Sequence, residues 1–135
     1  GGFLYSGSVR LLLMVLGPPR LMVLGGFIAA AGLGLCALHG SWLIDCLAFG
    51  AIGCGFYMLH NGIQVQATEL APTSRGAAIA LHAFFFFLGQ AVGPVAYTVA
   101  FAELGTEASF LVSAAVLAVT GLTTVRLLFG RWWPA

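Results

Sequence analysis

The chain has 135 residues, of which 61% are hydrophobic and only 7% are charged, and its mean hydropathy is +1.05. A soluble domain carries about 25% charged residues, so this composition excludes an ordinary water-soluble globular protein. The net charge is +1 and the sequence contains no lysine, which excludes the basic patch that a nucleic-acid partner requires.

The N-terminal stretch is apolar but broken. It begins with Gly1 rather than Met and shows no signal-peptide pattern, so we expect the chain to be a piece of a longer protein. Residues 1–9 are expected to be the end of a membrane helix. Residues 10–20 are expected to be a short connection, because Gly17 is followed by two prolines that end a helix.

Four later stretches are long and apolar enough to cross a bilayer, which takes about 20 helical residues. They are residues 21–38, 42–64, 76–101 and 109–129. Their frequent glycines predict close packing, since small residues let membrane helices approach one another. The expected fold is an all-α membrane protein with four transmembrane helices and the truncated end of a fifth.

The links between these spans are short. Residues 39–41 are expected to form a tight turn, and residues 103–107 an acidic turn. At the C-terminus, Arg131, Trp132 and Trp133 are expected to anchor the last helix at the membrane interface.

The charges support this topology. Four crossings place all five arginines on one side of the membrane, together with Glu69. Asp45, Glu103 and Glu107 fall on the other side. Basic residues are retained in cytoplasmic loops, so the arginine side and the C-terminus are expected to be cytoplasmic.

The span of residues 42–64 carries a polar stripe at alternating spacings of four and three, which gather residues on one helical face. It consists of Gly50, Cys54, Tyr57, Asn61 and Gln64. One interpretation is the lining of a solute pathway, because polar groups are expensive in lipid. The other is hydrogen bonding between packed helices, worth about 0.6 kcal/mol per pair. Gln66 is expected at the loop edge, off this stripe.

A second stripe follows on the next span, with His82, Phe86, Gln90, Gly93 and Tyr97. His82 could relay protons, since histidine titrates near physiological pH; the alternative is a packing role. Gln90 lies between Gly89 and Gly93 and is expected to support a close helix contact, with Pro94 directly after.

The connection between these two spans contains Glu69, Pro72 and Arg75. An ion pair between Glu69 and Arg75 would be exposed and weak unless it belongs to a conformational switch.

No catalytic motif is present, so no enzyme activity is expected. Cys36, Cys46 and Cys54 show neither a disulfide framework nor metal-ligand spacing, and we expect no metal and no cofactor. An intramembrane enzyme using His60 or His82 remains a minor hypothesis.

The passage NGIQVQATELAPTSRGAAIALHAFFFFLGQAVGPVAY resembles the tenth and eleventh helices of a major facilitator superfamily transporter and their cytoplasmic loop. The residues that match are Asn61, Glu69, Pro72, Arg75, Gly76, Gly89, Gly93 and Pro94. The earlier passage GSVRLLLMVLGPPRLMVLGG is similar to the loop between the eighth and ninth helices, without its usual acidic residue. The first passage is also similar to bacterial exporters of drugs and aromatic compounds.

The resemblance implies part of an MFS-type helical bundle in the bacterial inner membrane. In that family the tenth helix lines the central cavity and the eleventh packs where the two halves meet. The expected partners are the lipid bilayer, a small-molecule solute with proton coupling left open, and the missing N-terminal part of the transporter. The alternative is a small helical membrane protein, complete at this length, with a structural or accessory role.

Overall fold

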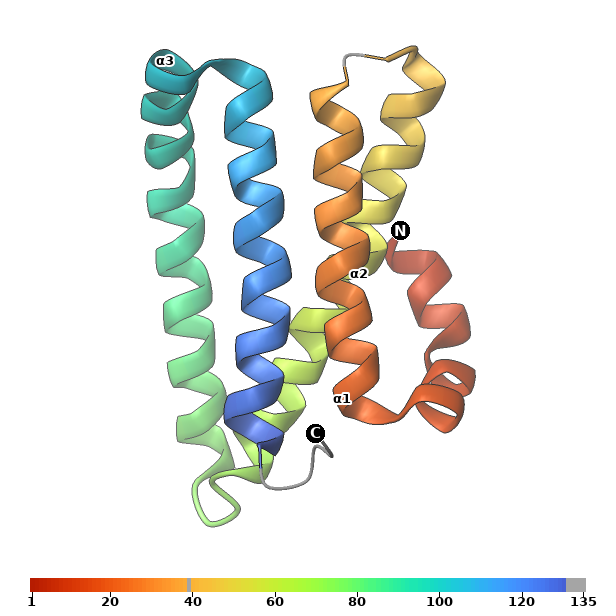
Figure 1. Cartoon of the computed structure of the whole chain (residues 1–135). Coiled ribbons are helices and arrows are strands. Elements are labelled where there is room, and N and C mark those ends of the chain that lie inside the picture. Colours follow the sequence, from red (N-terminus) through yellow and green to blue (C-terminus); the bar gives the residue numbers. More distant parts are fainter. Residues whose placement is uncertain (39, 131–135) are drawn as a thin grey trace.

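In the computed structural model, which describes residues 1–38 and 40–130, the chain forms three long helices and the described part contains no strand. They are α1 (Gly2–Ala37), α2 (Trp42–Glu69) and α3 (Arg75–Phe129), shown in Figure 1. Each is long and apolar enough to cross a membrane. The expected all-α class is therefore confirmed, and the apolar helices fit a membrane protein.

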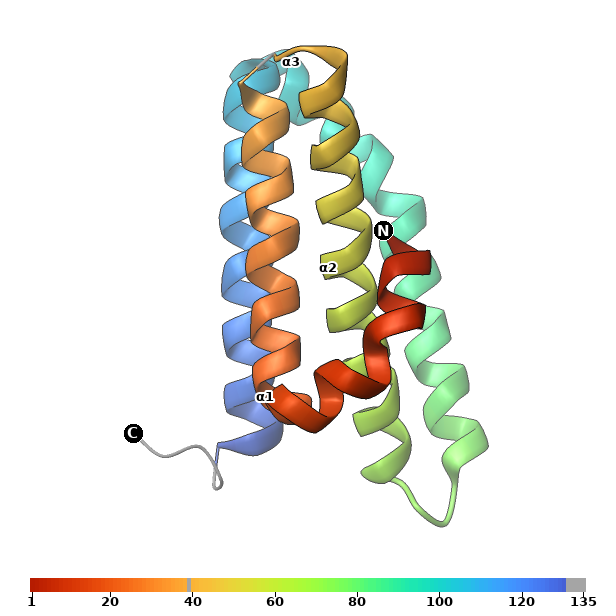
Figure 2. The ribbon, with the colours of Figure 1, turned by 90° about the vertical axis from the view of Figure 1, so that its right-hand side faces the viewer.

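Helix α1 bends sharply at Gly17, whose φ of 70° and ψ of 165° are not helical. The part before the bend turns back against α2, where the Tyr5 ring stacks on Tyr57 (Figures 1 and 2). Glycine adopts this positive φ without steric cost, and a proline fits the first turn of the helix that follows. The expected connection over residues 10–20 is wrong, because residues 10–16 are helical and only Gly17 interrupts the helix. Their run of leucine and methionine has high helix propensity.

Helix α2 runs to Glu69, five residues beyond the expected end at Gln64. Its polar last turn stays helical, and the Leu70 N–H closes it by donating to the Gln66 carbonyl at 3.0 Å. Residues 70–74 then connect α2 to α3. Within the predicted turn of residues 39–41, Gly40 and Ser41 are not helical, while His39 lies outside the described residues.

Helix α3 bends at Gly105, where φ is 78° and ψ is 171°. Its two parts run in opposite directions and meet next to the bend, where the ring centroids of Phe101 and Phe110 lie 5.8 Å apart, and they diverge farther from it (Figures 1 and 2). The Ser109 hydroxyl donates to the Gly105 carbonyl at 2.7 Å and ties the next helical turn to the bend. The acidic turn expected over residues 103–107 is thus a single-residue break, with helix on both sides.

The second part of α1 is the centre of the packing. It lies between α2 and the second part of α3 (Figure 1). Two small clusters of buried side chains hold these elements together. The first consists of Tyr5, Leu21 and Met58, and the second of Met22, Leu59 and Val125.

Glycines set the distances between these helices. A Cβ at Gly25 would meet the Met58 Cβ at 2.6 Å, and one at Gly26 would meet the Gly121 Cα at 3.1 Å. The predicted role of the glycines of residues 21–38 in close packing is therefore confirmed at Gly25, Gly26 and Gly32, but not at Gly34, where a Cβ would meet nothing within 4 Å.

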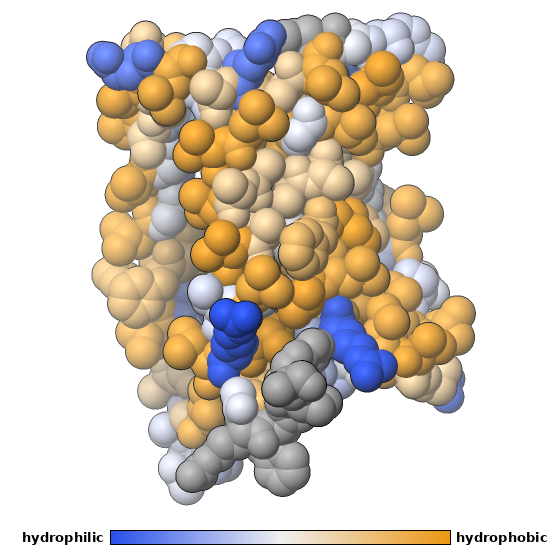
Figure 3. All heavy atoms as spheres, in the orientation of Figure 1, coloured by the Kyte–Doolittle hydropathy of each residue, from blue (hydrophilic) through white to orange (hydrophobic). Residues whose placement is uncertain are grey.

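Most large apolar side chains remain on the surface. Phe3 is 98% exposed and Leu127 is 85% exposed, and hydrophobic residues cover most of the face drawn in Figure 3. A water-soluble monomer rarely exposes so much contiguous apolar surface, so this surface suits contact with lipid or with further helices.

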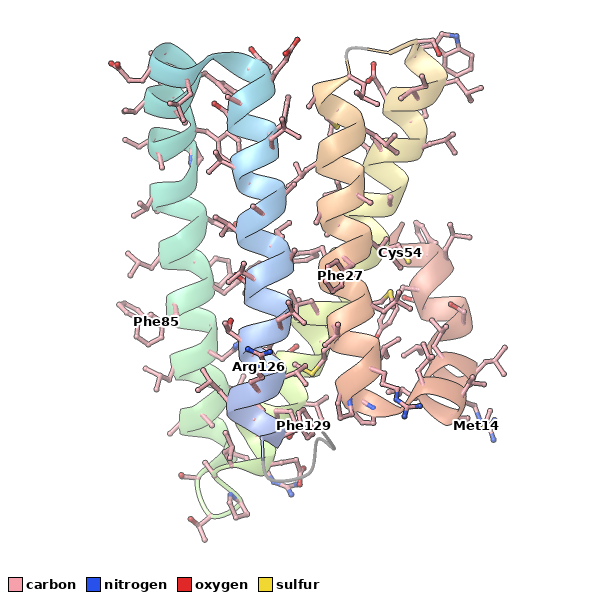
Figure 4. All side chains as sticks on the ribbon, viewed as in Figure 1. Met14, Phe27, Cys54, Phe85, Arg126 and Phe129 are labelled. Atoms are coloured by element: carbon pink, nitrogen blue, oxygen red, sulfur yellow. The ribbon has the colours of Figure 1, made fainter. Side chains whose placement is uncertain are left out.

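The charged residues separate toward the two ends of the molecule. The Gly17 bend, the 70–74 connection and the end of α3 lie at the lower end of Figure 1, and the Gly105 bend and the start of α2 lie at the upper end. Arg126 therefore lies toward the lower end (Figure 4), as do Arg20 just after the Gly17 bend and Arg75 at the start of α3. Asp45 in the first turn of α2 and Glu103 just before the Gly105 bend lie toward the upper end. The predicted anchor at residues 131–133 lies outside the described residues.

Candidate functional site

A hollow of about 640 Å³ lies between α1 and α2, with one side chain from the first turns of α3. Its walls are mostly apolar, and its polar lining side chains come mainly from the end of α2. The polar lining residues are Tyr5, Ser6, Asn61, Gln64, Gln66 and Thr68. No described lining residue carries a charge. A volume of this size and a mostly apolar wall with a few polar groups are typical of small-molecule sites.

The helical repeat of α2 brings the amides together. Asn61 and Gln64 are three residues apart and share a face, and both are half-buried. Gln66 is expected at the loop edge, off the polar stripe; it lies inside α2 instead, and it lines the same hollow from a neighbouring face. The hollow is wide enough along α2 to include side chains on neighbouring faces of its last turns.

The three amides are available to a ligand. Within residues 1–38 and 40–130, no hydrogen bond engages the side chains of Asn61, Gln64 or Gln66. Thr68 differs, because its hydroxyl donates to the Val65 carbonyl of its own helix at 2.7 Å. Each free amide offers both donors and acceptors, so the site can hold a solute with hydrogen-bonding groups of either kind.

Tyr57 does not line the hollow, although it belongs to the same predicted stripe. Its ring is 42% exposed and stacks on Tyr5 of α1, with ring centroids 6.4 Å apart and an interplanar angle of 18°. Through this contact the N-terminal part of α1 packs against α2. The structure therefore gives Tyr57 a packing contact at the border of the site.

The second stripe is divided. The beginning of this stripe faces α2. The centroid of the His60 ring of α2 lies 5.1 Å from the centroid of the His82 ring and 4.7 Å from that of the Phe86 ring. The spacing of the two histidines in the sequence also predicts this contact between their rings. His60 precedes Pro72 of the connection by about as many residues as His82 follows it, so a helical hairpin brings them to the same depth.

The middle of that stripe faces away from the other helices. Gln90 is exposed, and a Cβ built at Gly89 or Gly93 would meet nothing within 4 Å among the described residues. Pro94 stays inside the helix, and its carbonyl accepts a hydrogen bond from the Thr98 hydroxyl at 2.9 Å. The close contact predicted for Gly89 and Gly93 is therefore not made within the described part of this chain.

Glu69 and Arg75 join the end of α2 to the start of α3. The Arg75 Nη2 donates to the Glu69 Oε1 at 3.5 Å, and each side chain is 59% exposed. An exposed pair at this distance contributes little to stability.

Among the described residues, no group of three or more His, Cys, Asp or Glu side chains is placed to hold a metal ion. The three cysteines are free. No protein-family model, no curated protein and no solved structure matches this chain.

Proposed function

We propose that this chain is the C-terminal part of a secondary active transporter of the major facilitator type, which moves a small solute across the bacterial inner membrane by alternating access. The observation that carries the proposal is the hollow beside α2, where the unengaged amides of Asn61 and Gln64 meet an apolar wall. In transporters of this kind two helical halves rock about a central site. Helix α2 corresponds to the helix that the sequence resemblance assigns to the cavity lining.

The bends support four crossings in this proposal. Counting each part of α1 and α3 separately gives one N-terminal helix end and four helices of membrane length, α2 among them. The arginines at the lower end of Figure 1 mark the cytoplasmic side under the positive-inside rule. The C-terminus then lies in the cytoplasm.

The uncovered face of α3 supports a longer protein. A polar Gln90 beside two glycines is costly against lipid and suits a second helix that approaches closely. In this proposal the covering helix belongs to the part of the transporter that precedes this chain. The same face also suits a small helical protein that packs against a copy of itself or another membrane protein. The reading frame upstream of the Gly1 codon separates the two: about seven further apolar spans support the transporter, and a nearby start codon supports the alternative.

The site is tested by Asn61→Leu in the full-length protein, because leucine keeps a similar size and removes the amide. Loss of one or two hydrogen bonds of about 1 kcal/mol each predicts an apparent KM raised roughly tenfold. Efflux of a neutral apolar dye such as Nile red from cells provides the measurement, since no charged residue lines the hollow.

The matched control is Thr123→Val, which also removes a polar group from an apolar helix. Thr123 is exposed, and its hydroxyl bonds only carbonyls of its own helix, that of Val119 at 2.8 Å and that of Thr120 at 3.2 Å. Its dye efflux should equal that of the parent. Equal efflux by the parent and Asn61→Leu would remove Asn61 from the site and leave helix packing as its role.

A further inference from the structure

Four aromatic rings form the contact between α2 and the first part of α3. His60 stacks on Phe56 of its own helix, with centroids 5.1 Å apart and an interplanar angle of 10°. Its ring also contacts two rings of α3. The centroid of the His82 ring lies 5.1 Å away, with an angle of 37° between the two ring planes, and the centroid of the Phe86 ring lies 4.7 Å away. Two imidazoles thus face each other within an otherwise apolar aromatic cluster.

One atom in this cluster lacks a partner. The Nε2 of His82 is buried and makes no hydrogen bond. Buried polar groups are nearly always hydrogen-bonded, so each exception points to strain, to a function or to a missing ligand. A centroid separation of 5.1 Å lets a nitrogen of one imidazole come within hydrogen-bond distance of the other ring after a rotation of the rings.

Among the described residues, no carboxylate contacts the pair to fix its charge. The rings of α2 and α3 that touch it belong to Phe56 and Phe86. The part of α1 after Arg20 contains no charged residue, and the last turn of α3 contains Arg126, which is exposed. Glu69 and Arg75 of the α2–α3 connection bind each other. The imidazoles are therefore the titratable groups of this contact.

We propose that His60 and His82 form one proton-binding site, which holds a single proton between the two imidazole rings. A neutral imidazole has one donating and one accepting nitrogen, and a protonated one has two donors. When one ring takes up a proton, its new N–H can donate to the accepting nitrogen of the other. Such a charge-assisted bond is about twice as strong as a neutral one, and it supplies the partner that the His82 Nε2 lacks.

A second proton is disfavoured. It would place two positive charges 5.1 Å apart in an apolar contact, where charge repulsion is poorly screened. The two rings then titrate as one coupled unit. This site goes beyond the proposed transport function, because proton uptake by the pair does not depend on any solute being carried.

The test uses the protein in lipid nanodiscs with ¹⁵N-labelled histidine, in a His39→Asn background so that only the two rings are observed. Between about pH 8 and pH 5, the range in which histidine titrates, the pair should take up one proton, and both rings should shift with one common midpoint. In His60→Leu and in His82→Leu, the remaining ring should be at least tenfold less protonated at that midpoint.

Phe86→Leu is the matched control, because it removes a neighbouring ring and keeps both imidazoles; it should still take up one proton. Uptake of two protons or of none by the parent, or an unchanged titration in the single-histidine variants, would overturn the proposal. If a leucine variant loses its helices by circular dichroism, the proton count of the parent decides alone.

Discussion

The second part of α1 and the first part of α3 are both apolar helices with several glycines, yet those glycines lie in opposite surroundings. In α1, Gly25 and Gly26 contact the backbones of α2 and of the end of α3. In α3, a Cβ at Gly89 or Gly93 would meet nothing within 4 Å. The comparison teaches that a small-residue pattern predicts a close contact but not its partner. The first set holds this chain together, and the second meets no described residue.

The largest effect is expected from Gly55→Leu. A Cβ there would meet the Gly25 carbonyl oxygen and, at 2.5 Å, the Ala29 backbone nitrogen. Backbone atoms cannot move aside as a flexible side chain does, so the free energy of unfolding should fall by about 3 kcal/mol. Gly50→Leu on the same helix is the control, because a Cβ there meets nothing within 4 Å. Thermal unfolding in detergent should separate the two variants, and equal melting temperatures would contradict the α1–α2 packing.

A smaller loss is expected from Gly26→Leu. Its Cβ would meet the Gly121 Cα and the Leu117 carbonyl oxygen, both at 3.1 Å, so a shift of a few tenths of an ångström between α1 and α3 relieves part of the clash. The expected loss of stability is about 1–2 kcal/mol. Gly34→Leu, with open space around its Cβ, should not destabilise the protein in the same unfolding experiment.

The ion pair between the end of α2 and the start of α3 should matter less. Glu69→Gln removes the contact with Arg75, whose side chain is mostly exposed, and should lower the free energy of unfolding by less than about 1 kcal/mol. Any difference should vanish at about 1 M salt, because salt screens exposed charges. A loss that persists in high salt would instead assign the pair a packing role.

The smallest effect on this chain is expected from Gly93→Leu, which meets no described neighbour. Its stability should be unchanged or higher by up to about 1 kcal/mol, since glycine is a poor helix former. If the chain belongs to the proposed transporter, the same change in the full-length protein should abolish dye efflux at normal expression, because the leucine would occupy the proposed contact with a preceding helix. Normal efflux would show that this face points to lipid.

Much of the fold follows from apolar length and glycine chemistry. The predicted spans of residues 21–38, 42–64, 76–101 and 109–129 coincide with helical segments almost throughout. What hydropathy does not encode is how a helix ends. Helix continues through residues 10–16, most of which are strong helix formers, and through the last turn of α2. Neither stretch contains a glycine or a proline that would interrupt the helical hydrogen bonds.

The candidate site was predictable in part. The spacing of Asn61 and Gln64 placed both on one face, and both line the hollow. The position of Gln66 and the stacking of Tyr57 on Tyr5 were not predictable. They depend on where the N-terminal part of α1 lies after the Gly17 bend, which is a contact between segments rather than a property of either.

The two glycine bends also solve a problem of length. As a straight rod, the 36 residues of α1 would extend about 54 Å and the 55 residues of α3 about 82 Å, while the hydrocarbon core of a bilayer is about 30 Å thick. The positive φ values at Gly17 and Gly105 divide α1 into helical parts of about 22 and 30 Å and α3 into parts of about 45 and 36 Å. A single backbone conformation at each position thus brings each part closer to that thickness than the unbroken helix would be, and glycine adopts this conformation without steric cost.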